Sequence, residues 1–171
     1  MEQSAILDFL FWLELTSVGT FVRESPSLLA YPSTLFMHTM GLGLLVGVNA
    51  IVDLRLLGVA SSIPVRPLRG LFKFMWLGFW FAAVSGLLLL VADASTKLIN
   101  PVFYIKLSLI GGGVAIVMLL DRKVFRKDDF DFDHIPSRVK WMAGISLILW
   151  VGATTAGRLM AYVGPVSGLY F

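Results

Sequence analysis

The chain has 171 residues, of which 57% are hydrophobic and only 15% are charged, and its mean hydropathy is +0.83. A soluble domain carries about a quarter charged residues, and a chain of this length has no interior large enough to hide such an apolar surplus from water. The composition therefore excludes an ordinary soluble protein. The lack of cysteine in the sequence excludes disulfide frameworks, thiolate metal sites and iron–sulfur clusters.

The first segment, residues 1–30, is apolar but interrupted by acidic residues. The run Ala5–Val18 is too short and too acidic for a comfortable membrane span, and the segment lacks the basic start of a signal peptide. We expect an N-terminal interfacial amphipathic helix on the outer, periplasmic membrane surface, with Trp12 dipping into lipid. Pro26 and Pro32 then mark the turn into the first span.

Four stretches of about 20 apolar residues follow, which is the length that an α-helix needs to cross a bilayer. They lie at about residues 31–53, 72–92, 101–120 and 141–162. They predict an all-α polytopic membrane protein, with a four-helix transmembrane domain over residues 31–163 and a short periplasmic tail at residues 164–171.

The basic residues orient these spans. Ten of the fourteen Lys and Arg residues fall in the segments 54–73 and 121–140, on one side of the predicted bundle. The positive-inside rule places this side in the cytoplasm and both termini in the periplasm of a bacterial inner membrane. This placement explains the net charge of +3 without a nucleic-acid partner, and the bilayer is the expected partner.

Glycines occur at spacings that permit close helix contact. Gly43 and Gly47 form a GxxxG pair in the first span, and Gly111–Gly113 lie together in the third. Small residues let helix backbones approach each other in lipid. We therefore expect these glycines to pack helices together.

Ionisable side chains inside a bilayer are costly and tend to be functional. At 1.5 Å per residue, His38 and Lys106 lie about 22 Å from the cytoplasmic ends of their spans, Arg158 about 27 Å and Asp93 about 30 Å. All four fall in the outer third of a hydrocarbon core about 30 Å thick. The sequence thus predicts a histidine and two cations at neighbouring depths, below a carboxylate.

This set of residues suits haem b. Imidazole is a common axial ligand of haem iron, so His38 is the candidate metal ligand, while Lys106 and Arg158 would hold the two propionates. Gly41 lies on the same helix face as His38, three residues on, and would give the macrocycle clearance. His134 lies in a cytoplasmic loop, so a single haem would be five-coordinate or would take a second ligand from another subunit or from a methionine, with Met37, Met40 and Met160 as candidates.

Structural explanations compete with this one. His38 could hydrogen-bond a backbone carbonyl or the Thr154 hydroxyl, as buried polar groups in membrane bundles commonly do. Lys106 and Arg158 could extend to the outer surface without a ligand. Asp93 is better explained as a helix cap or as an ion-pair partner of Lys97.

Several short motifs resemble a family of small, functionally uncharacterised bacterial inner-membrane proteins over about residues 23–163. They are Tyr31-Pro32, His38-Thr39-Met40-Gly41, Val52-Asp53-Leu54-Arg55, Asn100-Pro101-Val102-Phe103 with Lys106, and Ala156-Gly157-Arg158. The chain is more distantly similar to HemJ-type protoporphyrinogen oxidases, which bind haem b through an early histidine, and to CopD-like membrane proteins. The likeness to HemJ-type proteins implies a cofactor at His38.

Three functions remain open from the sequence. The first is a b-type haem protein of electron transfer or redox chemistry near the periplasmic side. The second is a non-enzymatic subunit or scaffold, in a homo-oligomer or a larger membrane complex. The third is a transporter of copper, another small cation or a solute, in which Asn49 and Asp53 would continue the polar path from His38.

Overall fold

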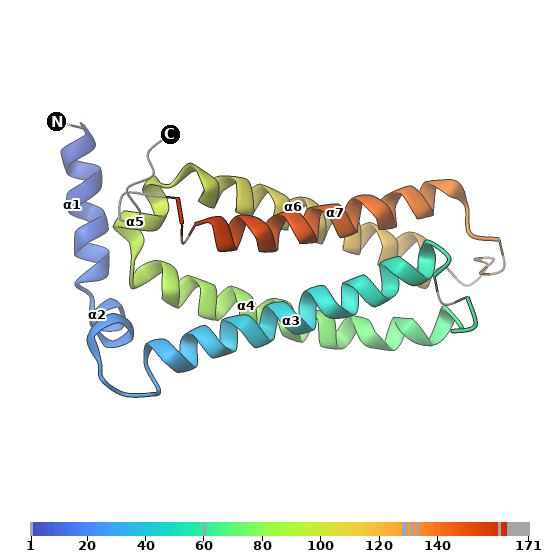
Figure 1. Ribbon diagram of the computed structural model, residues 1–171, viewed down its shortest axis with the longest axis horizontal. Helices are drawn as coiled ribbons and strands as arrows, with labels where there is room; N and C mark the ends of the chain where they lie inside the picture. Colours follow the sequence, from blue (N-terminus) through green and yellow to red (C-terminus); the bar gives the residue numbers. More distant parts are fainter. Residues whose placement is uncertain are drawn as a thin grey trace.

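The computed structural model describes residues 2–59, 61–127, 130, 132, 134–160 and 162–163, and this part of the chain contains helices and turns but no strand. Four long helices form its body: α3 (Tyr31–Leu56), α4 (Phe72–Val91), α6 (Pro101–Leu120) and α7 (Ser137–Leu159). They run side by side along the long axis of the molecule (Figure 1). With the helical turns η1 (Arg66–Leu71) before α4 and η2 (Asp121–Phe125) after α6, each is long and apolar enough to cross a membrane. The expected all-α, four-span membrane bundle is confirmed.

The helices extend beyond their apolar stretches. Helix α3 continues to Leu56, past the expected end at residue 53, and α7 begins at Ser137 rather than at residue 141. Pro136 has an extended backbone and fixes the start of α7, so Arg138 and Lys140 lie in its first turn. A charged residue ends an apolar stretch but does not end a helix. The expected tail at residues 164–171 lies outside the described residues.

The N-terminal segment forms two helices where the sequence predicts one over Ala5–Val18. Helix α1 (Glu2–Glu14) and helix α2 (Ser17–Glu24) are bent by 66° relative to each other, and only as one bent unit would they be long and apolar enough for a further span. The Thr16 side chain, as N-cap of α2, accepts a hydrogen bond from the Gly19 backbone N–H at 3.3 Å. Because the cap starts a new helix, the chain turns at this point.

Helix α1 lies across the end of the four-helix bundle (Figure 1). Large apolar side chains are exposed around most of its circumference; they are Ile6, Leu7, Phe9, Phe11 and Trp12. The expected amphipathic character therefore belongs to α2, which buries Gly19 and Val22 on one face. An apolar helix across the bundle end fits a position at the membrane interface.

The four long helices pair as two hairpins, α3 with α4 and α6 with α7, and contacts between α3 and α7 join the hairpins. In the first hairpin, a Cβ atom on Gly41 would lie 2.6 Å from the Ala82 backbone nitrogen and 2.8 Å from the Gly78 carbonyl oxygen. In the second, a Cβ atom on Gly113 would lie 2.9 Å from the Trp150 ring. Glycine is thus required where each hairpin is closest.

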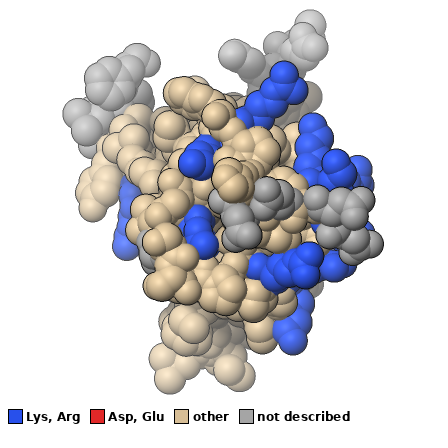
Figure 2. All heavy atoms as spheres, turned by 90° about the vertical axis from the view of Figure 1, so that its right-hand side faces the viewer, with Lys and Arg blue, Asp and Glu red and all other residues tan. Residues whose placement is uncertain are grey.

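The bundle has two different ends. Helices α1, α2 and the short α5 (Ala94–Ile99) lie at one end, here called the α1 end, and the α3–α4 and α6–α7 loops lie at the other, the basic end (Figure 1). Lys and Arg side chains surround the basic end, as Figure 2 shows for the described residues. The structure therefore gathers both basic segments at one end, while the side of the membrane they face stays a prediction.

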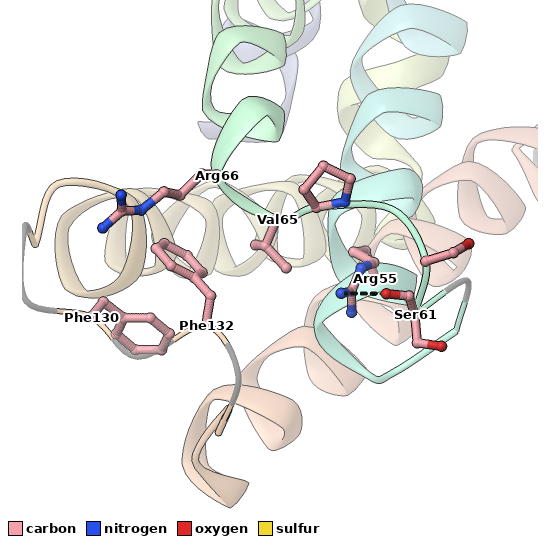
Figure 3. A pocket seen from close by; sticks show the side chains of 8 residues that line it. Arg55, Ser61, Val65, Arg66, Phe130 and Phe132 are labelled. Carbon is pink, nitrogen blue, oxygen red and sulfur yellow. Dashed lines mark hydrogen bonds between the residues drawn. The ribbon is translucent and has the colours of Figure 1, made fainter.

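Arginine side chains hold the loops of the basic end together. Arg55 donates hydrogen bonds to the carbonyl oxygens of Ser61, at 3.0 Å, and of Ile63, which closes the α3–α4 loop. Arg66 lies over the Phe132 ring, with its Cζ atom 5.6 Å from the centroid, so it joins this loop to the α6–α7 loop. Both arginines face a hollow of about 480 Å³ between the loops (Figure 3).

The hydrophobic core is concentrated towards the basic end. Its largest fully buried apolar side chains are Leu56, Met75, Leu120, Val124 and Trp150, and they come from both hairpins and from η2. The aromatic rings of Phe72 and Phe125 extend it, with centroids 5.0 Å apart. We call this region the packed half, and the region between it and the α1 end the open half.

Candidate functional site

Two hollows, of about 550 and 620 Å³, lie in the open half between the hairpins. They share five lining residues, and we call their joint space the slot; these residues are Leu35, His38, Lys106, Gly157 and Arg158. The first hollow is also bordered by α2, α4 and α5, and the second lies among α3, α6 and α7. Volumes of 300–1,000 Å³ are typical of small-ligand sites.

The slot brings together three residues that are far apart in the sequence. His38 is on α3, Lys106 on α6 and Arg158 on α7, and all three line both hollows. Their similar depths along separate helices are the sequence signal that points to this meeting. The structure thus places the candidate axial ligand and both candidate propionate partners around one space.

The hydrogen bonds of His38 define its tautomer. Its Nδ1 atom lies 2.9 Å from the Ala82 carbonyl oxygen and 3.2 Å from the Ser85 Oγ atom, both on α4. The Ser85 hydroxyl donates its own hydrogen to the Phe81 carbonyl, so both groups beside Nδ1 act as acceptors. Nδ1 therefore carries a hydrogen, and in the neutral imidazole Nε2 keeps its lone pair. The carbonyl hydrogen bond that the sequence analysis names as the structural alternative for His38 is present, whereas Thr154 bonds carbonyls of its own helix.

Gly86 makes room for the His38 ring. A Cβ atom at this position would lie 3.0 Å from the ring Cε1 atom and 3.3 Å from Nδ1. Gly86 also lines the first hollow, beside the ring. An alanine here would press on the imidazole and shift it away from Ala82.

Four cations line the slot, and two of them are neutralised at its rim. Lys97 forms an ion pair with Asp93 at 3.3 Å, as expected from the sequence, and donates to the Leu89 carbonyl oxygen at 2.6 Å. Arg23 pairs with Glu14 at 3.1 Å and with Glu24 at 2.9 Å. These two cations are held by their partners.

Lys106 and Arg158 have no such partners. Neither makes a hydrogen bond or an ion pair with a described residue, and Lys106 is half-buried. The Lys106 side chain runs beside α7, where a Cβ atom on Gly157 would lie 3.7 Å from its Nζ atom. Arg158 is exposed, as expected if it extends to the outer surface, whereas the uncompensated charge of the half-buried Lys106 lies at the edge of an apolar space, where an isolated charge is costly.

Glu14 connects α1 to the rim of the slot. Its carboxylate accepts a hydrogen bond from the Ser95 backbone N–H, on α5, at 2.6 Å, in addition to the Arg23 contact. Burial alone raises the pKa of Glu14, but the hydrogen bonds with Ser95 and the charge and hydrogen bond of Arg23 outweigh it, so the pKa is lower than usual. The N-terminal helices thus attach to α5 through one ionised carboxylate.

The walls of the slot between its polar residues are apolar. They include Leu42, Val46, Ile110, Leu90 and Phe103. Of the three methionines considered as second ligands, Met160 lines the first hollow, while Met37 and Met40 line neither. His134 lies in the α6–α7 loop, at the basic end.

The glycines of α3 have roles opposite to those expected, whereas Gly113 of α6 packs against Trp150 as expected. Gly41, the expected clearance for a ligand, is buried at the contact of α3 with α4 and lines neither hollow. Gly43 and Gly47, the expected packing pair, have no atom within 4 Å of a Cβ position and line the second hollow. Clearance in the slot therefore comes from Gly43 and Gly47, together with Gly86.

Sequence reasoning missed the α4 side of the site, where Ala82, Ser85 and Gly86 support His38. One signal was available, because Ser85 is the only hydroxyl side chain in the charge-free stretch of residues 74–92. The Ala82 carbonyl gives no such signal, since any residue supplies one. Its use depends on how α4 is rotated against α3.

Comparison with known protein families, with curated proteins and with solved structures finds no match for this chain. The geometry of the slot is therefore the basis for assigning a function.

Proposed function

We propose that the protein binds haem b in the slot and serves in electron transfer or a related redox reaction within the membrane. His38 would supply the axial ligand through Nε2, and Lys106 and Arg158 would hold the two propionates. The observation that carries this proposal is the convergence of an available imidazole lone pair and two unpaired cations on one apolar-walled space.

The donor set favours haem over a bare metal ion. The described residues include no group of three His, Cys, Asp or Glu side chains able to hold a metal, and zinc or copper sites draw several ligands from the protein. Haem iron brings four nitrogen ligands of its own and needs only axial ones from the chain. When bound, haem supplies one-electron chemistry.

The chain would orient the His38 ring, raise the basicity of its Nε2 atom and keep water away from the ligand. The Ala82 carbonyl fixes the His38 tautomer and makes Nε2 a better donor, as the outer partners of metal-binding histidines do. The apolar walls keep water from the ligand's faces, while the cations stay at the α1 end of the slot. Met160 is the candidate for a second axial ligand, because it lines the same hollow.

A transport function receives less support. On the way to the basic end, the last residues that line the slot are Gly47, Ile110 and Trp150. Beyond them lies the buried apolar cluster of the packed half, where Asn49, Asp53 and Ser146 are buried polar side chains that line neither hollow. A water-filled path across the membrane would need polar lining to continue through this region.

The test is the visible spectrum of the protein purified in detergent from cells with ample haem, oxidised and then reduced with dithionite. We expect a Soret band and, after reduction, sharp α and β bands. His38→Ala should remove them, whereas the matched variant His134→Ala, at the basic end, should keep them. Lys106→Ala and Arg158→Ala should each lower the haem content without removing the bands.

A flat visible spectrum from folded wild-type protein would overturn the proposal, as would a full spectrum in His38→Ala. The slot would then be a site for a colourless anion or part of a contact between subunits. Size-exclusion chromatography with light scattering would separate these two outcomes.

A further inference from the structure

Asp53 is a buried carboxyl group outside the slot, which the proposed haem site does not use. It lies on α3 in the packed half, three residues before the helix ends at Leu56, and its exposed fraction is 0%. A carboxylate fully removed from water costs several kcal/mol unless it is paired or neutralised. Its surroundings therefore decide its protonation state.

Two polar side chains surround Asp53. Asn49, one turn earlier on α3, has its Nδ2 atom 2.6 Å from Asp53 Oδ2 and 3.0 Å from the Oγ atom of Ser146, on α7. Both are buried, with exposed fractions of 2% and 0%. The second carboxyl oxygen, Oδ1, has no hydrogen-bond partner. One or two neutral contacts do not compensate a full negative charge.

No cation compensates Asp53. It takes part in none of the ion pairs of the described residues. The nearest arginine on α3, Arg55, is held by two loop carbonyls. On α7, Arg138 and Lys140 are exposed in the first turn, and on η2 the acidic Asp121 is paired with Arg126 at 2.7 Å. Among the described residues, therefore, no ion pair reaches the Asp53 carboxyl group.

We propose that Asp53 is a proton-binding site in the membrane interior, with Asn49 and Ser146 as its hydrogen-bonding cradle. The two ends of an asparagine amide are equivalent in shape. With the amide oxygen towards Asp53, it accepts both the carboxyl O–H and the Ser146 O–H.

The Asp53 site has a defined position along α3. On α3, Asn49 lies two residues beyond Gly47, where the slot ends, and Asp53 lies one turn from the end of the helix. At 1.5 Å per residue, Asp53 is about 5 Å from the last residue of α3. The site therefore lies between the slot and the water at the basic end.

Infrared spectroscopy of the full-length protein in lipid vesicles tests this directly. A protonated carboxyl group in an apolar interior gives a carbonyl stretching band separate from those of carboxylates and amides. We expect such a band at neutral pH, its loss in Asp53→Asn, and a shift in its frequency in Ser146→Ala. Asp121→Asn, which removes a carboxyl group with an ion-pair partner, is the control and should leave the band unchanged.

Labelling wild-type protein with carbon-13 at the aspartate carboxyl carbon assigns the band to aspartate even if Asp53→Asn fails to fold. A wild-type spectrum without a labelled carboxylic band would overturn the proposal. So would carboxylate bands that change when sodium replaces potassium and that disappear in Asp53→Asn, because Asp53 would then hold a cation. The haem content does not enter this measurement, so it stands or falls separately from the function proposed for the slot.

Discussion

The packed half and the open half of the bundle are both built from apolar helix segments, but they differ in how completely side chains fill the space between the hairpins. In the packed half, side chains such as Leu56 and Leu120 fill the space between the hairpins and are at most 1% exposed. In the open half, glycines and unpaired cations leave a slot between the same two hairpins. The bundle thus concentrates its stability near the basic end and keeps its candidate site near the α1 end, as ligand-binding regions commonly lie in the less stable parts of a fold.

The largest expected effect tests where stability resides. Leu120→Ala should lower the free energy of unfolding by about 2–4 kcal/mol, because it opens a closed cavity in the packed half. Leu42→Ala, at the slot wall, should cost about 1 kcal/mol or less, since its atoms already border open space. Thermal or SDS-induced unfolding in detergent measures both. Equal losses would contradict the division into two halves.

The second effect tests the exchanged roles of the glycines. Gly41→Ala should destabilise the protein by about 1–3 kcal/mol, because its methyl group would lie 2.6 Å from backbone of α4. Gly43→Ala adds its methyl group to open space and should be neutral or stabilising by up to about 1 kcal/mol. The same unfolding assay ranks the two variants. Destabilisation by Gly43→Ala would show that this glycine packs against a partner.

The third prediction concerns the support of His38 and rests on the proposed haem site. Gly86→Ala should weaken haem binding about tenfold, because the new methyl group displaces the imidazole from the Ala82 carbonyl. Gly144→Ala, with open space at its Cβ position, is the matched control. Haem titration followed at the Soret band gives both affinities. If the two variants bind alike, Gly86 has no part in positioning the ring.

The smallest effect concerns the attachment of α1. Glu14→Gln should loosen α1 from α5 by about 1 kcal/mol or less, and hydrogen exchange of the α1 amides should rise. Because the pKa of Glu14 is lowered in the folded protein, its contribution is present above its ordinary pKa of 4.5. That contribution is lost as the pH falls through the lowered value. Wild-type exchange should therefore approach that of Glu14→Gln only under acidic conditions; a difference that persists there would contradict the role of the carboxylate.

The sequence predicts the spans but not how they are rotated. Charge-free stretches locate α3, α4, α6 and α7, because charged residues are excluded from lipid. In a membrane, however, apolar side chains face both the lipid and the core, so the apolar pattern does not tell which face of α3 packs. This is why the roles of Gly41 and Gly43 are exchanged, although His38 and Lys106 are correctly expected at neighbouring depths.

Partners that depend on tertiary contacts are likewise beyond the sequence. Asn49 and Asp53 are one turn apart on one helix, which the sequence shows directly. Their contact with Ser146 requires α7 to cross α3 at that level. The break at Thr16 has a sequence signal, since threonine is a common residue at the cap of a new helix. The acidic residues in this segment favour a single interfacial helix instead.

The short helix α5 has a mechanical consequence. It is the covalent link between the two hairpins at the end where they are furthest from close packing, and in Figure 1 it connects α4 to α6. Its six residues have a length of about 9 Å as a helix, close to the usual spacing of packed helices. Helix α5 therefore sets the distance between the two hairpins at the α1 end, and with it the width of the slot. Shortening or lengthening it by a turn would change the spacing of the hairpins at this end and also the lining of the first hollow, to which Thr96 and Lys97 of α5 belong.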